Sequence, residues 1–399
     1  MSSVVYQTIM TYLKRTAAAA VILLAGIFSQ QIKDKEGFFW SCVPPTISHF
    51  LRSNYLFAKL FILFANGSAK FFGALKLLST KPAAITTFLQ PPHMMASGIR
   101  YATKPGDTNS YRSQHQLLDV YAPPIENGRL HPVFVFIHGG IWTLFNRDFF
   151  RLVGEKFAER GIVCVVPSYS VHPDGDAADQ INDVRLVLEW THANIQNYGG
   201  SPWRIVLGGQ SSGAHVSSQH LLRSCIDLPL SEAPPLCGYI GMSGVYDPLH
   251  HNLTFEKKRG VNDVSPLVPA TGGGTGGVSD TDSAEKSEMQ KYSSCLMAQA
   301  MKLDQLHRLC PILLLHGEED MTVPVESSVN FYNSVVRSMG GEDDGSWMEG
   351  RRKITFQLLE NVDHATYLFD ISVAGSGAKE NSMMNSVVEF VDAVTKGGE

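Results

Sequence analysis

Two adjacent serines stand between glycines at residues 209–213, Gly-Gln-Ser-Ser-Gly, directly after the apolar run WRIVL at 203–207. This G-x-S-x-G pattern is typical of a serine on a sharp strand-to-helix turn, where small flanking residues permit close backbone approach. The central position makes Ser211 the candidate nucleophile. The backbone N–H of the next residue, Ser212, is expected to face the oxyanion of a tetrahedral intermediate. The pattern therefore predicts nucleophilic catalysis at Ser211.

A second glycine motif, HGGIW at residues 138–142, follows the apolar run PVFVFI at 132–137. A glycine pair after a strand can offer backbone N–H donors with no side chain in the way. We therefore predict that Gly139 and Gly140 complete an oxyanion hole with Ser212.

A serine hydroxyl is a poor nucleophile until a base takes its proton, and that base needs a carboxylate to orient it. The sequence contains both groups in the chain order serine, acid, histidine. Asp320 lies in LHGEEDMTVP, just past the apolar run PILLL, and His364 lies in ENVDHATY, just past KITFQLL. We predict that Asp320 orients His364, which acts first as general base and then as general acid.

Neighbouring titratable residues leave alternatives open. Glu318 or Glu319 could replace Asp320 as the acid, whereas Asp363 adjoins the candidate base but is expected to point away from it. His138 and His215 lie near the nucleophile in the sequence, but we interpret both as structural, one shaping the glycine turn and the other lying on the following helix.

The segments that must position these side chains alternate along the chain: short apolar runs are followed by amphipathic segments, as in an α/β domain. Runs that are apolar on consecutive residues, such as PVFVFI and PILLLH, fit strands buried on both faces of a mostly parallel sheet. Helical spacing falls at 149–160, 176–199, the segment after Ser211, and 325–339. Strands are predicted at 117–122, 132–138, 162–169, 204–209, 237–244, 311–317 and 353–360. The sequence therefore predicts a doubly wound α/β fold with helices on both faces.

Composition excludes several classes of function. The 399 residues carry a formal charge of −5 with no long basic run, so there is no electrostatic signal for nucleic-acid binding. The six cysteines show no metal-type pairs, and the glycines at 208, 209 and 213 belong to the serine turn instead of a dinucleotide fingerprint. We expect no cofactor and no metal, and a small-molecule or lipidated ester as substrate.

The first 99 residues differ in kind from the rest. Residues 16–28 form an apolar run shorter than the ~20 residues that span a bilayer, and residues 55–78 mix large apolar side chains with three lysines. We expect this region, 1–99, to be a hydrophobic membrane-associating or cap region before a catalytic domain at 100–399. The Gly-, Ser- and acid-rich stretch 270–288 is predicted to be a flexible insertion.

The motifs resemble those of the α/β-hydrolase superfamily, in its hormone-sensitive-lipase and carboxylesterase-like branch. HGGIW, YGGSPWRIVLGGQSSGAH, HGEEDMTVP and DHATYL are similar to motifs of the prenylcysteine methylesterases. The pieces HGGIW and SSGAH also resemble those of kynurenine formamidases. The resemblance implies Ser211 as nucleophile, Asp320 as acid and His364 as base. It implies oxyanion donors at Gly139, Gly140 and Ser212, where Ser212 stands at a position that is commonly alanine.

These observations lead us to expect a serine carboxylesterase that hydrolyses a lipophilic ester through an acyl-enzyme, most specifically a prenylcysteine methyl ester. The alternatives are an aryl-formamidase acting on N-formylkynurenine, a broad lipid or short-acyl esterase, and an interaction module without chemistry. The apolar N-terminal segments favour membrane association at the endoplasmic reticulum or another endomembrane, with a soluble cytoplasmic protein as the alternative.

Overall fold

The computed structural model describes residues 90–102, 116–125, 128–227, 236–259, 262, 265–271, 283–341, 354–364 and 382–396. All of them belong to one compact unit of the chain, residues 67–399. The two apolar N-terminal segments expected to associate with membranes lie outside the described residues. Within these ranges, no helix combines the length and the apolar character needed to cross a membrane.

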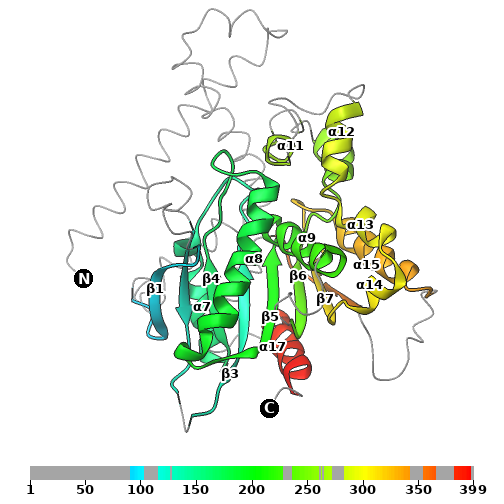
Figure 1. Cartoon of the computed structure of the whole chain (residues 1–399). Coiled ribbons are helices and arrows are strands. Elements are labelled where there is room, and N and C mark those ends of the chain that lie inside the picture. Colours follow the sequence, from blue (N-terminus) through cyan, green and yellow to red (C-terminus); the bar gives the residue numbers. More distant parts are fainter. Residues whose placement is uncertain are drawn as a thin grey trace, which may run out of the picture. The chain divides into compact units, whose positions relative to one another are not determined.

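An eight-stranded sheet forms the centre of this unit (Figure 1), with strand order β1-β2-β4-β3-β5-β6-β7-β8. The strands β3 to β8 pair in parallel, and β2 runs antiparallel to both β1 and β4. The bounds are β1 Met94–Arg100, β2 Leu117–Tyr121, β3 His131–Ile137, β4 Val163–Pro167, β5 Gly200–Gln210, β6 Gly238–Met242, β7 Ile312–Gly317 and β8 Ile354–Leu359. All seven predicted strands are confirmed, and β1 is an additional edge strand.

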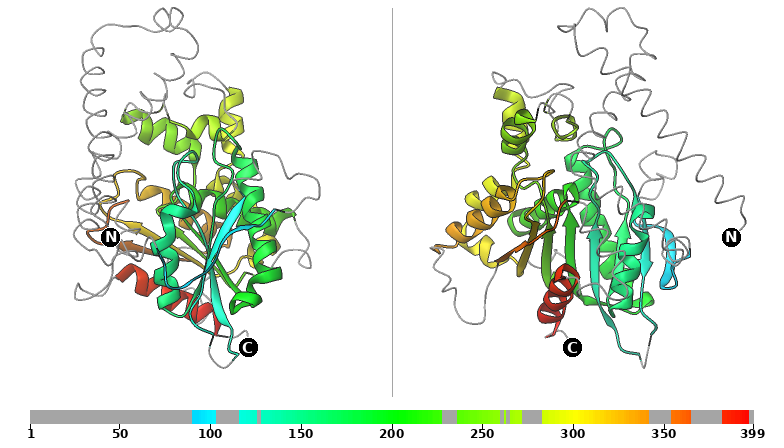
Figure 2. Two further views of the ribbon diagram at one scale, coloured as in Figure 1. Left: turned by 90° about the vertical axis from the view of Figure 1, so that its left-hand side faces the viewer. Right: turned by 180° about the vertical axis from the view of Figure 1, so that it is seen from behind.

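Helices cover both faces of the sheet (Figure 2), which confirms the predicted doubly wound architecture. Helices α8, α9, α13 and α15 pack on one face, and α7 and α17 pack on the other. The longer helices are α7 Arg151–Glu159, α8 Ala177–Asn194, α9 Ser212–Asp227, α12 Ser283–Gln290, α13 Ser294–Ala300, α15 Glu326–Ser338 and α17 Ser382–Thr395. The shorter ones are η1 Arg147–Phe150, η2 Ile195–Tyr198, α10 Pro248–His250, the π-helical turn η3 His251–Glu256, α11 Leu267–Ala270 and α14 Leu303–His307.

Strand β3 shows why these apolar runs form central strands. Successive side chains point to opposite faces of a sheet, so a strand covered on both sides must be apolar at every position. Val133 and Val135 enter the core beneath α8 and α9, whereas Phe134 and Phe136 enter the core beneath α7 and α17. All four side chains are fully buried.

The predicted flexible insertion at 270–288 is helical at its carboxyl end. Helix α12 begins at Ser283, and Met289 near its end is fully buried in the main core. Residues 272–282 lie outside the described residues. The composition of the segment did not indicate this helix, because its anchoring apolar residue lies just beyond the Gly-, Ser- and acid-rich stretch.

Candidate active site

The candidate nucleophile lies on a tight turn between β5 and α9. Ser211 has φ +57°, in the left-handed region that non-glycine residues seldom adopt. Its N–H donates to the Met242 carbonyl at 2.9 Å, and its own carbonyl accepts from the His215 N–H at 3.1 Å. A Cβ on Gly209 would lie 2.5 Å from the backbone of Gly213. The structure therefore has the strained strand-to-helix geometry that the motif predicts.

The candidate oxyanion turn lies directly against the serine turn. A Cβ on Gly139 would come within 3.0 Å of the Ser211 Cβ and within 2.8 Å of the Gln210 carbonyl oxygen. Gly140 has φ +143°, and a Cβ there would meet the Leu144 carbonyl at 2.1 Å. Because neither position has room for a side chain, the backbone of this turn lies against Ser211, as the predicted oxyanion hole requires.

The candidate base and acid are joined by a hydrogen bond. The Nδ1–H of His364, just past β8, donates to Asp320 Oδ2 at 2.8 Å. The other carboxylate oxygen of Asp320 accepts from the N–H groups of Thr322 and Val323, each at 2.9 Å. With Nδ1 carrying the proton, neutral His364 keeps its Nε2 lone pair available to accept one.

Burial separates Asp320 from the alternative acids. Asp320 is buried, whereas Glu318 and Glu319 are exposed. Burial by itself raises the pKa of Asp320, but the charge of His364 and hydrogen bonds from His316 and His364 outweigh it, so the pKa lies well below its ordinary value. Asp320 is thus an ionised carboxylate fixed against the candidate base.

Comparison with known proteins supports the same assignment of fold. The BD-FAE family pattern matches residues 118–225. A protein of Oryza sativa subsp. japonica named "Probable isoprenylcysteine alpha-carbonyl methylesterase" is 31% identical over 225 residues, which are 55% of this chain and 49% of that protein. The isoprenylcysteine alpha-carbonyl methylesterase of Arabidopsis thaliana is 30% identical over 224 residues, again 55% of this chain and 49% of the relative. The chain therefore spans about half the length of the curated relatives it matches.

Solved structures agree on the fold. Esterase B of Lactobacillus Rhamnosis superposes with a TM-score of 0.56 at 15% identity, covering 83% of this chain and 97% of its own. A truncated carbohydrate esterase from gut microbiota gives 0.54 at 17% identity, covering 75% of this chain and 96% of its own. The chain is therefore similar to carboxylesterase-like α/β-hydrolases over the matched residues and shares the fold of these esterases.

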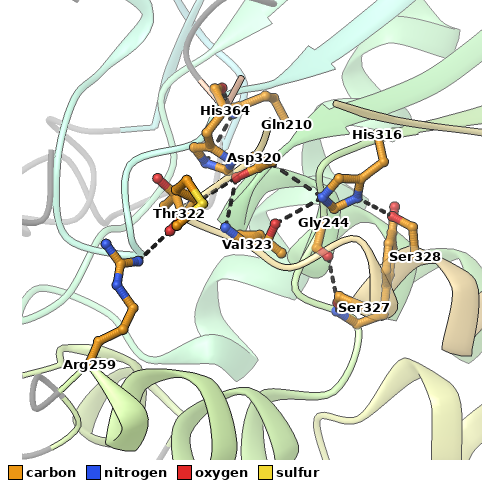
Figure 3. A network of polar contacts seen from close by, with 12 residues as sticks. Gln210, Gly244, Arg259, His316, Asp320, Thr322, Val323, Ser327, Ser328 and His364 are labelled. Atoms are coloured by element: carbon orange, nitrogen blue, oxygen red, sulfur yellow. Dashed lines mark hydrogen bonds and ion pairs between the residues drawn. The ribbon is translucent and has the colours of Figure 1, made fainter. Parts of the chain in front are cut away.

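The loop that carries Asp320, residues 318–323 (the acid loop), is held by a histidine that sequence reasoning missed. His316, the fifth residue of β7, is fully buried. Its Nε2–H donates to the Val323 carbonyl at 2.9 Å and lies 3.4 Å from Asp320 Oδ2, while its Nδ1 accepts from the Ser328 hydroxyl at 2.7 Å (Figure 3). A histidine four residues before the candidate acid was the available signal. His316 therefore connects strand β7 to Asp320 and to Val323 in the acid loop, and to Ser328 at the start of α15.

The two histidines interpreted as structural support the oxyanion turn. The His138 ring stacks on Tyr169 and Phe150, and its Nδ1–H donates to the Gly139 carbonyl at 2.8 Å. His215 on α9 accepts from the Trp142 indole N–H at 3.0 Å. Burial lowers the pKa of both His138 and His215 to about 4, so both are neutral at pH 7.

The link between Trp142 and His215 joins the two glycine motifs. Ile141 and Trp142 have φ +49° and +63°, so this turn keeps its conformation only when its surroundings enforce it. The indole N–H of Trp142 donates to His215 Nδ1, and the His215 Nε2–H donates to the Tyr292 carbonyl at 2.8 Å. His215 thereby fixes the oxyanion turn onto the helix that follows the nucleophile.

We expect His215→Ala to lower kcat about ten- to a hundredfold with a smaller change in KM, because small displacements of oxyanion donors are costly. Steady-state hydrolysis of a chromogenic short ester measures this effect. His192→Ala is the matched control, since the His192 Nδ1–H donates to the Pro202 carbonyl, at the end of β5 away from Ser211. Equal kcat values for the two variants would contradict a role for His215 in catalysis.

A short segment after β6 lies close to the acid loop. Arg259 donates to the Met321 carbonyl beside Asp320 (Figure 3). In η3, burial raises the pKa of Glu256 to about 7 and lowers that of His251 to about 3. The charges of Asp320 and His364 also affect the pKa of His251, so this histidine lies near the candidate acid and base, which we call the candidate dyad. Sequence reasoning did not indicate these residues.

Across the described ranges, no three His, Cys, Asp or Glu side chains gather as a metal site would need.

Proposed function

We propose that this α/β-hydrolase is a serine carboxylesterase, with Ser211 as nucleophile, His364 as base and Asp320 as orienting acid. The observation that carries the proposal is the 2.8 Å hydrogen bond from His364 to a buried, ionised Asp320, at the same sheet edge as a serine held at φ +57°. The relatives named as esterases and methylesterases support it.

The proposed reaction has two halves. As His364 Nε2 takes the hydroxyl proton, Ser211 Oγ attacks the ester carbonyl carbon, and the backbone N–H groups of Gly139, Gly140 and Ser212 hold the oxyanion. The carbon–oxygen bond to the alcohol then breaks while His364 returns the proton to the departing oxygen. Water repeats the sequence on the acyl-enzyme, giving its proton to His364 and releasing the acid and free Ser211.

For the substrate we propose a lipophilic ester, most specifically a prenylcysteine methyl ester. Two relatives that carry isoprenylcysteine methylesterase names at 30–31% identity support this choice. Exposed apolar side chains near the site also favour a lipophilic substrate. The ring of Phe145 lies 3.0 Å from where a Gly140 Cβ would be, its neighbour Phe149 is 61% exposed, and Met321 beside Asp320 is 60% exposed. Membrane association through residues 1–99 remains a prediction of the sequence.

An aryl-formamidase is the second candidate, and Arg259 favours it. This half-buried guanidinium lies beside the acid loop, and among the described residues no carboxylate forms an ion pair with it. A substrate that carries a carboxylate, such as N-formylkynurenine, would give this guanidinium a direct ion pair in addition to the charges of Glu256 and Asp320. The same serine mechanism would then release formate.

Methanol release distinguishes the candidates. We expect the purified protein to release methanol from farnesylcysteine methyl ester faster than it hydrolyses N-formylkynurenine or a short acyl ester, and Ser211→Ala to release none. The bulky prenyl group can bury apolar surface that the other substrates lack. Turnover of the formyl substrate or the short ester alone would retain the serine mechanism and reject the prenylcysteine substrate.

A further inference from the structure

The first variable position of the G-x-S-x-G motif, just before Ser211, is occupied by a residue that contacts the candidate base. Gln210 ends β5 and is only 4% exposed. Its side-chain Nε2 lies 3.3 Å from His364 Nε2 and 3.3 Å from the His364 carbonyl oxygen (Figure 3). One amide group thus approaches both the ring and the backbone of a residue 154 positions away in the chain.

The same side chain lies against the oxyanion turn. A Cβ on Gly139 would be 2.3 Å from the amide oxygen of Gln210. A side chain at position 139 would therefore displace this amide and would also meet the Gln210 carbonyl oxygen at 2.8 Å. The absence of a side chain at Gly139 thus leaves room for the Gln210 amide. This amide lies between the candidate oxyanion turn and His364.

The contact falls on the nitrogen that the reaction uses. Because His364 Nδ1 donates its proton to Asp320, the lone pair of a neutral His364 is on Nε2. The Gln210 amide N–H donates to that lone pair. Among the described residues, no hydrogen bond joins the Ser211 hydroxyl to His364. Ser211 must therefore take the place of the amide on Nε2 before it can transfer its proton.

We infer that Gln210 is a positioning residue for the general base, an inference that rests on the proposed function. In the resting enzyme it holds the His364 ring between Asp320 and the serine turn, and its second N–H keeps the His364 backbone in place. When substrate binds, the amide yields Nε2 to the Ser211 hydroxyl and keeps its bond to the His364 carbonyl. Asp320 at Nδ1 and the Gln210 amide at the backbone carbonyl then together confine His364 to the small range of orientations that proton transfer needs.

Several charged or titratable groups surround this ring. Asp320 contacts Nδ1 from the loop after β7, with His316 behind it on the strand. From the segment after β6, His251 interacts through charge with both Asp320 and His364, and Arg259 interacts through charge with Asp320. Gln210 is the neutral member of this set, and replacing it by an acid changes one charge at the reacting nitrogen without changing side-chain shape.

The test uses a fluorophosphonate, which reacts covalently with an activated serine whatever the natural substrate. The second-order rate of Ser211 labelling is measured from pH 5 to 9 for the wild type, Gln210→Met, Gln210→Glu and Gln116→Met. Gln116 is the matched control, because its half-buried amide donates to Asp183 at 2.6 Å and does not contact the dyad. Thermal melting of each variant reports on folding.

We expect Gln210→Met to label about tenfold more slowly, since an untethered base loses much of its effective concentration near the hydroxyl. Gln210→Glu should keep a near-wild-type rate at high pH, while the acid limb of its profile moves up by about one pH unit, because a carboxylate stabilises the protonated base. Gln116→Met should label at the wild-type rate even where its melting temperature falls.

Two results would overturn the inference. Gln210→Met with the wild-type rate and pH profile, or Gln210→Glu with an unmoved acid limb, would leave Gln210 a purely structural residue. Absence of Ser211 labelling in the folded wild type would instead reject the proposed function, and the positioning role with it. The two failures are therefore distinguishable in one series.

Discussion

Ser211→Ala is expected to abolish ester hydrolysis, with kcat falling by at least about 10⁴-fold, because the remaining backbone donors and substrate binding give only a small residual rate. The fold should persist, since the Ser211 contacts that shape the turn are made by its backbone. Hydrolysis of a short chromogenic ester, with thermal melting to check the fold, measures both effects.

The adjacent serine provides the control. Ser212 begins α9, is fully buried, and is proposed to act through its backbone N–H. Ser212→Ala keeps that N–H, so kcat should remain within about threefold of the wild type. A larger loss in Ser212→Ala than in Ser211→Ala would mean that the nucleophile is assigned to the wrong serine.

Asp320→Asn is expected to lower kcat about 10³- to 10⁴-fold, because an amide no longer fixes the tautomer of His364 or stabilises the imidazolium that forms in the transition state. Glu318→Gln, a neutral replacement of an exposed alternative acid two residues earlier, should leave kcat unchanged. A large loss in Glu318→Gln together with an active Asp320→Asn would assign the acid role to Glu318.

The low pKa of Asp320 also predicts how stability depends on pH. A carboxyl whose pKa is depressed on folding stabilises the protein above its unfolded value, ordinarily 3.8, and this stabilisation is lost as the pH falls through the folded value. Asp320 therefore stays ionised from pH 5 to 8. Urea unfolding should show that the wild type loses more stability below pH 4 than Asp320→Asn does, and equal losses would contradict the depressed pKa.

Most of the fold follows from local patterns in the sequence. Consecutive apolar residues such as those of β3 can be buried only where both faces of a strand are covered, so the central strands were predictable. The edge strand β1 was not, because its alternation is mostly half-exposed and exposed, with few large apolar residues. Helix α17 also went unpredicted, although its Met383 and Val387 are buried.

The candidate site was predictable where chemistry depends on neighbours in the chain. Ser211 and its flanking glycines lie within one turn, so residue types and spacing alone indicate the strained geometry. The same holds for Gly139 and Gly140, which follow a strand directly. The choice of Asp320 over Glu318, Glu319 and Asp363 was less secure, since all four stand near strand ends and their types are equivalent.

Local sequence patterns were enough to predict the central strands, the serine turn and the glycine turn. They also indicated the chain order of the candidate serine, acid and histidine. Only the tertiary structure decided which carboxylate reaches His364, that His316 holds the acid loop, that His215 holds Trp142, and that Gln210 contacts the base. These contacts join residues 44, 73 and 154 positions apart in the chain, in the pairs Asp320–His364, Trp142–His215 and Gln210–His364. Residues so far apart in the chain come into contact only when parallel strands bring their carboxyl ends to one edge of the sheet. No local sequence pattern specifies that arrangement.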